Sequence, residues 1–131
     1  MLRWWAKLFG DRGEREAVRY VRGLGWRILA RKHRNRLGEI DLIAQDGDTI
    51  VFIEVKTRRS DAAGRPEDAI TPAKQKQLTG AALAFLKKHR LLQRRARFDV
   101  ISIVWPDMAA APQIEHFRNA FPPVGFGQMY S

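Results

Sequence analysis

Residues Gly38–Lys56 read GEIDLIAQDGDTIVFIEVK, and this stretch decides the fold of the chain. Two apolar runs rich in β-branched residues, Ile40–Ala44 and Ile50–Val55, predict strands that are buried on both faces. Between them, Asp46-Gly47 predicts a tight turn, because glycine adopts positive φ without a Cβ clash. The stretch therefore predicts a hairpin in the middle of a sheet.

Three charged residues, Asp41, Glu54 and Lys56, lie inside these apolar runs. A buried charge is costly unless it is paired or binds a metal ion. Alternation along a strand places Glu54 and Lys56 on one face. A two-residue or four-residue hairpin loop keeps Asp41 on that face, and the four-residue loop sets it directly opposite Glu54. A regular three-residue loop would put it on the other face, so an even loop or a compensating bulge is expected.

Two carboxylates held close together repel each other, and a divalent cation removes that repulsion. Mg²⁺ uses hard oxygen ligands, keeps several waters and often binds a substrate phosphate as well. A neighbouring lysine can orient the attacking water and stabilise negative charge on phosphorus. Asp41 and Glu54 are therefore candidate ligands for Mg²⁺ or Mn²⁺, and Lys56 is a candidate catalytic residue. The structural alternative is an ion pair between Lys56 and one of the two acids.

A first helix is predicted over Asp11–Leu24, with Gly23 and Gly25 at its end. Glu14 lies in its first turn, where a negative charge suits the helix dipole. Glu14 also lies on the inward side of the helix, so it is a candidate member of the acidic site, with Glu16 as its competitor. The predicted buried stripe consists of Ala17, Tyr20, Val21 and Leu24.

A basic run, Arg31–Arg36, follows a strand predicted over Trp26–Lys32 and leads into the acidic hairpin. A charge run is usually only a solvated face, but its place beside the hairpin favours contacts with a nucleic-acid backbone. Basic residues also follow Lys56 and flank Gln75. The predicted nucleic-acid-binding residues are Arg31, Lys32, Arg34, Arg36, Arg58, Arg59, Lys74 and Lys76.

A second helix is predicted from Thr71-Pro72 to about His89, because Thr suits the N-cap and Pro suits the first helical position. Gln75 is the polar member of its inward stripe. Its amide either bonds to backbone near the helix end or reaches a metal-bound water or a scissile phosphate, and both remain open. The stripe is Gln75, Leu78, Ala82 and Phe85. Residues 57–66 are predicted to form a loop, and strands are predicted over Phe98–Trp105, where Asp99 is assigned a structural role, and over Gln113–Asn119.

The predicted order is one helix, three strands, one helix and two strands. This order predicts a single α/β domain with a mixed sheet flanked by helices. The 131 residues are enough for one core, and 45% of them are hydrophobic. We expect the domain to occupy residues 11–121, with an N-terminal extension over 1–10 and a C-terminal tail over 122–131.

Charge and composition narrow the class of partner. The chain has 24 Lys and Arg against 14 Asp and Glu, a formal net charge of +10, which favours a polyanionic partner. It has no cysteine, which excludes disulfides, zinc–thiolate sites and a thiol nucleophile and fits a reducing cytoplasm. No apolar run approaches the roughly 20 residues of a membrane span.

Several strings in the chain resemble the YraN family of bacterial proteins, and the spacing of Asp41 and Glu54-Val55-Lys56 resembles the PD-(D/E)xK nuclease core, although no proline precedes Asp41. The resemblance implies a restriction-endonuclease-like fold related to archaeal Holliday-junction resolvases. In those resolvases a glutamate at the position of Glu14 belongs to the metal site. The matching strings are Gly13-Glu14, Arg36–Ala44, Glu54–Arg59, Thr71–Gln75, Arg97–Val100 and His116–Phe121.

The leading hypothesis is a Mg²⁺- or Mn²⁺-dependent nuclease that acts on DNA, with branched or junction DNA as one candidate substrate. Asp41 and Glu54, together with Glu14 and the Val55 carbonyl, would hold the metal, and Lys56 would position the water. The rival is a non-catalytic nucleic-acid-binding module that keeps the fold. The choice between DNA and RNA and the oligomeric state stay open, although junction resolution usually needs two active sites and so a homodimer.

Overall fold

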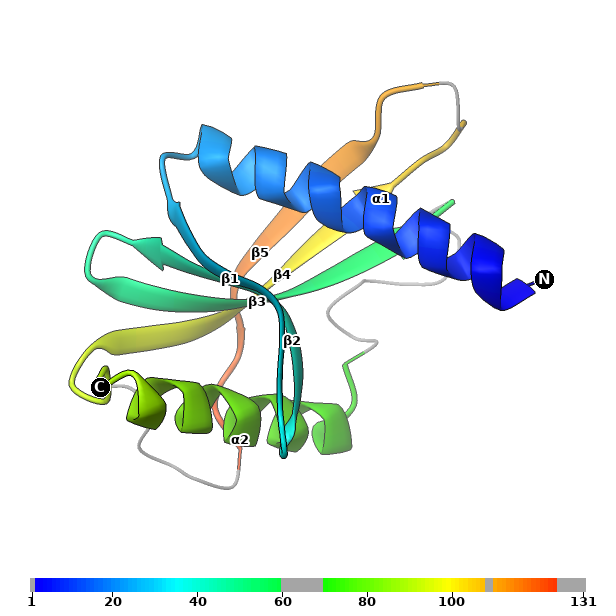
Figure 1. Ribbon diagram of the computed structural model, residues 1–131. Helices are drawn as coiled ribbons and strands as arrows, with labels where there is room; N and C mark the ends of the chain where they lie inside the picture. The colour runs from blue at the N-terminus through cyan, green and yellow to red at the C-terminus, as the bar shows by residue number, and fades with distance from the viewer. Residues whose placement is uncertain (1, 60–69, 108–109, 125–131) are drawn as a thin grey trace.

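The computed structural model describes residues 2–59, 70–107 and 110–124. A mixed sheet of five strands lies between two helices, one on each face (Figure 1). This is the predicted α/β class, and it is consistent with a restriction-endonuclease-like fold. The elements follow the predicted order: α1 (Leu2–Gly23), β1 (Arg27–Asn35), β2 (Gly38–Asp46), β3 (Thr49–Arg58), α2 (Pro72–Lys88), β4 (Arg95–Val104) and β5 (Gln113–Phe121).

The strands lie side by side in chain order, so β3 is the central strand. β3 and β4 are parallel, whereas all other neighbours are antiparallel. A parallel pair needs a long crossover connection, which α2 supplies. The central position of β3 explains its nearly continuous apolar sequence, because side chains on both of its faces are covered.

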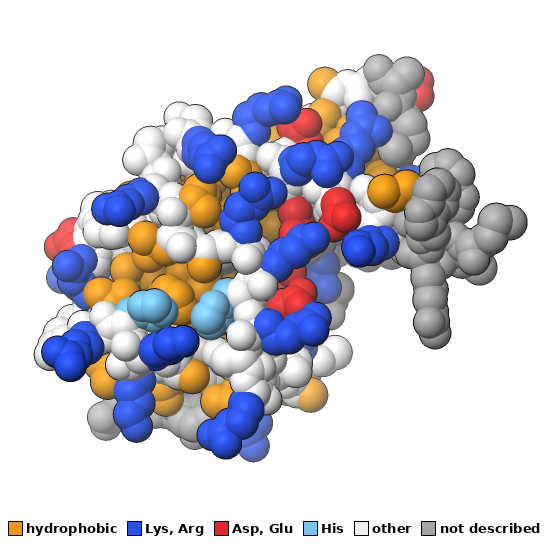
Figure 2. Space-filling view, in the orientation of Figure 1, with side chains coloured by type: hydrophobic (Ala, Val, Ile, Leu, Met, Phe, Trp, Pro, Cys, Tyr) orange, Lys and Arg blue, Asp and Glu red, His pale blue; other side chains and the backbone are white. Residues whose placement is uncertain are grey.

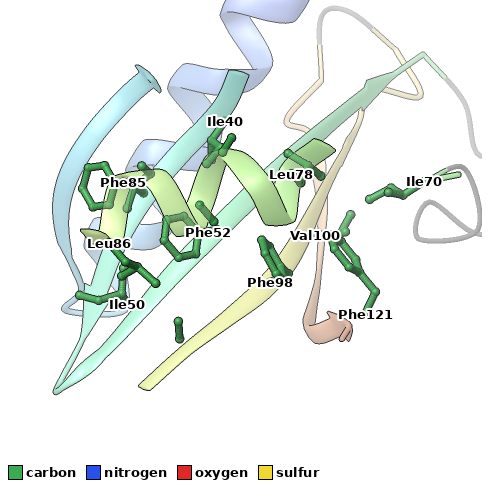
Figure 3. Close-up of a cluster of buried hydrophobic side chains, with 14 residues drawn as sticks. Ile40, Ile50, Phe52, Ile70, Leu78, Phe85, Leu86, Phe98, Val100 and Phe121 are labelled. Carbon is green, nitrogen blue, oxygen red and sulfur yellow. The ribbon is translucent and has the colours of Figure 1, made fainter. Parts of the chain in front are cut away.

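Each face of the sheet carries its own core cluster. On the α2 side, Phe52 of β3 packs against Phe98 of β4 and Phe85 of α2, with ring centroids 5.7 and 6.0 Å apart (Figure 3). On the α1 side, Ala17 and Val21 belong to a cluster that includes alternate residues of the same strands. Because alternate residues of β3 point to opposite faces, side chains of this one strand pack in the clusters under both helices. The α1-side cluster includes Val51, Ile53, Ile101, Ile103 and Trp105.

The observed bounds of α2 confirm the start and the end predicted for the second helix. The Thr71 hydroxyl accepts a hydrogen bond from the Lys74 backbone N–H at 3.2 Å, as an N-cap does, and Pro72 is the first helical residue. The helix ends at Lys88, with His89 as the C-cap residue. No helix in the described part of the chain is both long and apolar enough to cross a membrane.

Several predicted boundaries differ from the structure. α1 begins at Leu2 instead of the predicted Asp11, so residues 2–10 form the first turns of the same helix. Leu24 is 39% exposed instead of buried, because the helix ends before it and Gly25 turns the chain with a φ of 87°. β1 continues to Asn35, since it pairs with β2 as far as Gly38, so most of the basic run lies on a strand.

The loop predicted from residue 57 begins later than expected. β3 continues to Arg58 because β4 pairs with it along its whole length, up to Val104. The rest of that predicted loop and most of the predicted tail lie outside the described residues.

Asp99 is a fully buried acid whose hydrogen bonds join three elements. It accepts hydrogen bonds from the Arg97 guanidinium at 3.0 Å and the Asn119 backbone N–H at 2.9 Å. The His116 ring lies 2.7 Å from Asp99 on one side and 3.1 Å from the Tyr20 hydroxyl of α1 on the other. Burial alone would raise the pKa of Asp99, but these hydrogen bonds outweigh it and hold the pKa below its usual value.

Replacing Asp99 with Asn is expected to destabilise the fold by about 3–5 kcal/mol, because Arg97 and His116 would lose their buried partner. The contribution of Asp99 is present above its unfolded pKa of 3.8 and is lost as the pH falls below it. Urea denaturation at neutral pH measures the change. Asp48→Asn, in the exposed β2–β3 turn, is the matched control, and equal stability of the two variants would contradict the structural role of Asp99.

Candidate active site

The β2–β3 hairpin has the even loop that the charge pattern required. Gln45 pairs with Ile50, and Asp46 pairs with Thr49, so the loop consists of Gly47 and Asp48. This is the register of the predicted four-residue loop, but the additional pair between Asp46 and Thr49 shortens the loop to two residues, with Gly47 at a φ of 62°. Side chains of β2 and β3 that lie opposite each other still share a face, as the parity argument predicted.

Asp41 lies where β2 and β3 separate. Their ladder ends at Leu42 and Ile53, one step before Asp41 would face Glu54, so the predicted backbone pairing of the two acids is not formed. The alternation is also broken there, because Ile40 and Leu42 pack into opposite clusters although they are two residues apart. Instead, the Asp41 carboxylate accepts a hydrogen bond from the Val55 backbone N–H at 2.8 Å. The Asp41 side chain thereby replaces the backbone acceptor that a continued β2–β3 ladder would supply.

Glu54 projects from the central strand, and its side chain is only 8% exposed. Burial, followed by the charge of Asp41 and a hydrogen bond with it, raises the pKa of Glu54 to about 7, against the opposing effect of Lys74 and Lys56. The Glu54 carboxylate lies 3.6 Å from the Lys56 ammonium and 4.0 Å from that of Lys74. Glu54, Lys56 and Lys74 therefore meet on the α2 side of the sheet, with Asp41 next to Glu54.

The sequence predicts Lys74 as a nucleic-acid contact, and its position beside Glu54 is not predicted. Its position depends on how the first turn of α2 packs over β3, which no local pattern reveals. The only available signal was its place next to Gln75. The amide nitrogen of Gln75 donates to the Ile70 carbonyl at 3.0 Å, which is the backbone contact considered above. A contact between Gln75 and water or phosphate stays a prediction.

Glu14 approaches the site from α1. Burial, and then the charge of Asp41, raises its pKa, so the two carboxylates sense each other. Its carboxylate lies 3.8 Å from the Lys32 ammonium, which also bonds to Asp11 at 2.7 Å. Among residues 2–59, 70–107 and 110–124, no three acidic or histidine side chains lie close enough to hold a metal ion together. The structure thus brings together Asp41 and Glu54, while Glu14 and the Val55 carbonyl remain predicted ligands.

A groove of about 550 Å³ lies between the β1–β2 hairpin and α2. Hairpin and helix are in close contact, because Asn35 donates to the Ala81 carbonyl at 3.1 Å and a Cβ at Gly38 would come within 2.8 Å of Gln77. Lys74 lines the groove, and its ammonium lies 4.0 Å from the Glu54 carboxylate, so this side chain connects the groove with the acids. Its lining residues are Leu37, Ala73, Lys74, Lys76, Gln77 and Gly80.

Some of the predicted nucleic-acid-binding residues have acidic neighbours. Arg34 lies 2.7 Å from Glu39, and Lys32 forms an ion pair with Asp11 of α1. Such exposed pairs contribute little to stability, so a phosphate can replace the carboxylate at small cost. In Figure 2, several acidic side chains lie near the middle of the visible face with Lys and Arg side chains around them. Arg58 and Lys74 are half-buried, and the exposed members of the set are Arg31, Lys32, Arg34, Arg36, Arg59 and Lys76.

Comparison with known proteins identifies relatives that span most of this chain. The model of the family described as "Uncharacterised protein family UPF0102" matches residues 13–103. A "UPF0102 protein" of Geotalea uraniireducens (strain Rf4) is 50% identical over 115 residues, which cover 88% of this chain and 90% of the relative. One from Pelotomaculum thermopropionicum is 41% identical over 115 residues, covering 88% and 96%. The chain therefore belongs to family UPF0102, which is the YraN family.

Proposed function

We propose that this protein is a phosphodiesterase that cuts DNA with the help of Mg²⁺ or Mn²⁺. The observation that carries the proposal is the meeting of Asp41 and Glu54 on the central strands, with Lys56 beside them. Two carboxylates that repel each other in a largely buried position destabilise the fold. Such an arrangement is typical of functional sites, because structural acids are usually fully compensated.

The residues present suit a small, hard cation. Mg²⁺ needs only one or two carboxylates, since water and substrate phosphate complete its shell. The Val55 N–H holds one oxygen of Asp41, and the carboxylate also interacts with Glu54. Glu54 faces Asp41, so the two acids would hold the ion between them, and Glu14 could contribute through a water.

When bound, the cation would polarise the phosphoryl group and lower the pKa of a bound water. Asp41 and Glu54 would hold the cation, and the Val55 N–H fixes the orientation of Asp41. The Lys56 ammonium, now 3.6 Å from Glu54, orients the attacking water and stabilises charge that develops on the phosphate. Lys74 approaches from α2 and adds a second positive charge.

Nucleic acid as the substrate is supported by charge. The net charge of +10 and the lysines along the groove favour a polyphosphate backbone. The choice of DNA rests on the resemblance to junction resolvases. A homodimer stays a prediction.

Asp41→Asn is expected to reduce metal-dependent cleavage at least about 100-fold, the order of loss when one electrostatic group is removed from a transition state. The amide oxygen can still accept from the Val55 N–H, so the melting temperature without metal should stay the same or rise. The measurement uses labelled linear, nicked, flapped and four-way-junction DNA, plus RNA, with Mg²⁺ or Mn²⁺. Thermal melting of the same variants shows whether Mg²⁺ still stabilises the fold.

Asp48→Asn is again the matched control, because it makes the same chemical change in an exposed turn. Undiminished cleavage by Asp41→Asn would refute the assigned site. A wild-type protein that binds DNA well, cuts nothing and gains no stability from millimolar Mg²⁺ or Mn²⁺ would instead be the non-catalytic module.

The pH dependence of stability tests Glu54 without any substrate. Its folded pKa of about 7 lies above the ordinary value of 4.5, so the folded protein holds an extra proton between these values. Stability without metal should therefore fall as the pH rises through that window, by at most about 3 kcal/mol. Relative to wild type, Glu54→Gln should gain stability between pH 5 and pH 8. Parallel denaturation curves across this range would show that Glu54 does not titrate as described.

A further inference from the structure

A second cluster of basic side chains lies at the C-terminal end of α2, away from the carboxylates. It is visible as Lys and Arg side chains at the lower left of Figure 2, where that end of the helix lies in Figure 1. All its members are exposed, and the chain has no Asp or Glu between residues 69 and 98. We name it the distal basic surface, and it consists of Lys87, Lys88, Arg90, Arg94 and Arg95.

Helix stability explains only part of this cluster. Lys87 and Lys88 lie in the last turn of α2, where positive charge suits the helix dipole. Arg94 and Arg95 lie beyond the helix, at the start of β4, and have no such role. None of the five pairs with a carboxylate among the described residues, and Asp46 of the neighbouring hairpin is engaged by Arg97 at 3.2 Å. The cluster thus carries an excess of like charge that an anionic ligand would relieve.

α2 sets the distance between this surface and the candidate active site. Lys74 lies beside Glu54 in the first turn, and Lys87 lies 13 residues further along the same helix. A rise of 1.5 Å per residue separates the two by about 20 Å. Duplex DNA advances 3.4 Å per base pair along each strand, so this separation corresponds to about six base pairs.

We propose that the distal basic surface binds the phosphate backbone of a DNA duplex about six base pairs from the scissile phosphate. The inference rests on the proposed function and adds a requirement on the substrate: a duplex arm that extends along α2. The groove beside Lys74 and Lys76 holds one end of this path, and the distal basic surface holds the other.

The test compares two variants of equal charge. The distal variant carries Lys87→Gln, Lys88→Gln, Arg94→Gln and Arg95→Gln. The control variant carries Lys7→Gln, Arg15→Gln, Arg19→Gln and Arg22→Gln, which are exposed positions of α1 on the opposite face. Each set lowers the net charge from +10 to +6, because four positive charges are removed. Glutamine keeps helix propensity, and circular dichroism melting verifies folding.

Binding is measured by fluorescence polarisation without divalent metal, on hairpin-closed duplexes of about 4 and about 18 base pairs, of which only the longer can span the separation. The wild type should bind the longer duplex with the steeper salt dependence. The distal variant should lose about 0.9 of log–log slope for each phosphate contact removed on the longer duplex, while the control variant keeps most of the slope. Equal slopes for the two variants on that duplex would overturn the inference.

A lysine-acylation footprint of the wild-type protein gives an answer that needs no variant. The longer duplex should protect Lys87 and Lys88 together with Lys74 and Lys76, and should leave Lys7 reactive. Protection of Lys74 and Lys76 alone would overturn this inference and leave the proposed function intact. Absence of any DNA binding by the wild type would overturn both, whereas cleavage by Asp41→Asn tests the proposed function alone.

Discussion

The hydrogen bond from the Val55 backbone N–H to the Asp41 carboxylate is the interaction on which the site depends. It forms where β2 leaves β3, so the side chain replaces a backbone partner that the ladder no longer supplies. A buried N–H without a partner would cost about 1–3 kcal/mol, which gives this contact a structural reason as well. The contact fixes the Asp41 carboxylate beside Glu54, where its charge adds to the effect of burial in raising the pKa of Glu54.

Two buried acids on neighbouring strands, Glu54 and Asp99, have pKa values shifted in opposite directions. Asp99 is adjacent to Ile53 in the β3–β4 register, one step from Glu54, but it lies among donors from Arg97, Asn119 and His116. Its pKa is lowered, as expected for a carboxylate whose charged form is stabilised. Burial and the neighbouring Asp41 raise the pKa of Glu54, and Lys74 and Lys56 offset only part of this effect. The first arrangement stabilises the domain, whereas the second is costly until something positive binds.

α2 runs from the candidate active site to the distal basic surface. Its inner side packs on the sheet through Leu78 and Phe85, which fixes the helix relative to β3. Its first turn brings Lys74 to Glu54, and its last turn carries Lys87 and Lys88. A rigid helix keeps these two ends at a constant separation, which suits a regular polymer such as duplex DNA better than a small, compact substrate.

Local rules explain what could be predicted from the sequence by itself. Alternation placed Glu54 and Lys56 on one face, the even-loop requirement held, and Thr71-Pro72 marked the start of α2, because each depends on residues a few positions apart. The tertiary structure alone decided the irregular backbone at Asp41, the position of Lys74 beside Glu54 and the hydrogen bonds between Asp99, His116 and Tyr20. These depend on contacts between segments far apart in the chain, which hydrophobic periodicity and turn chemistry do not specify.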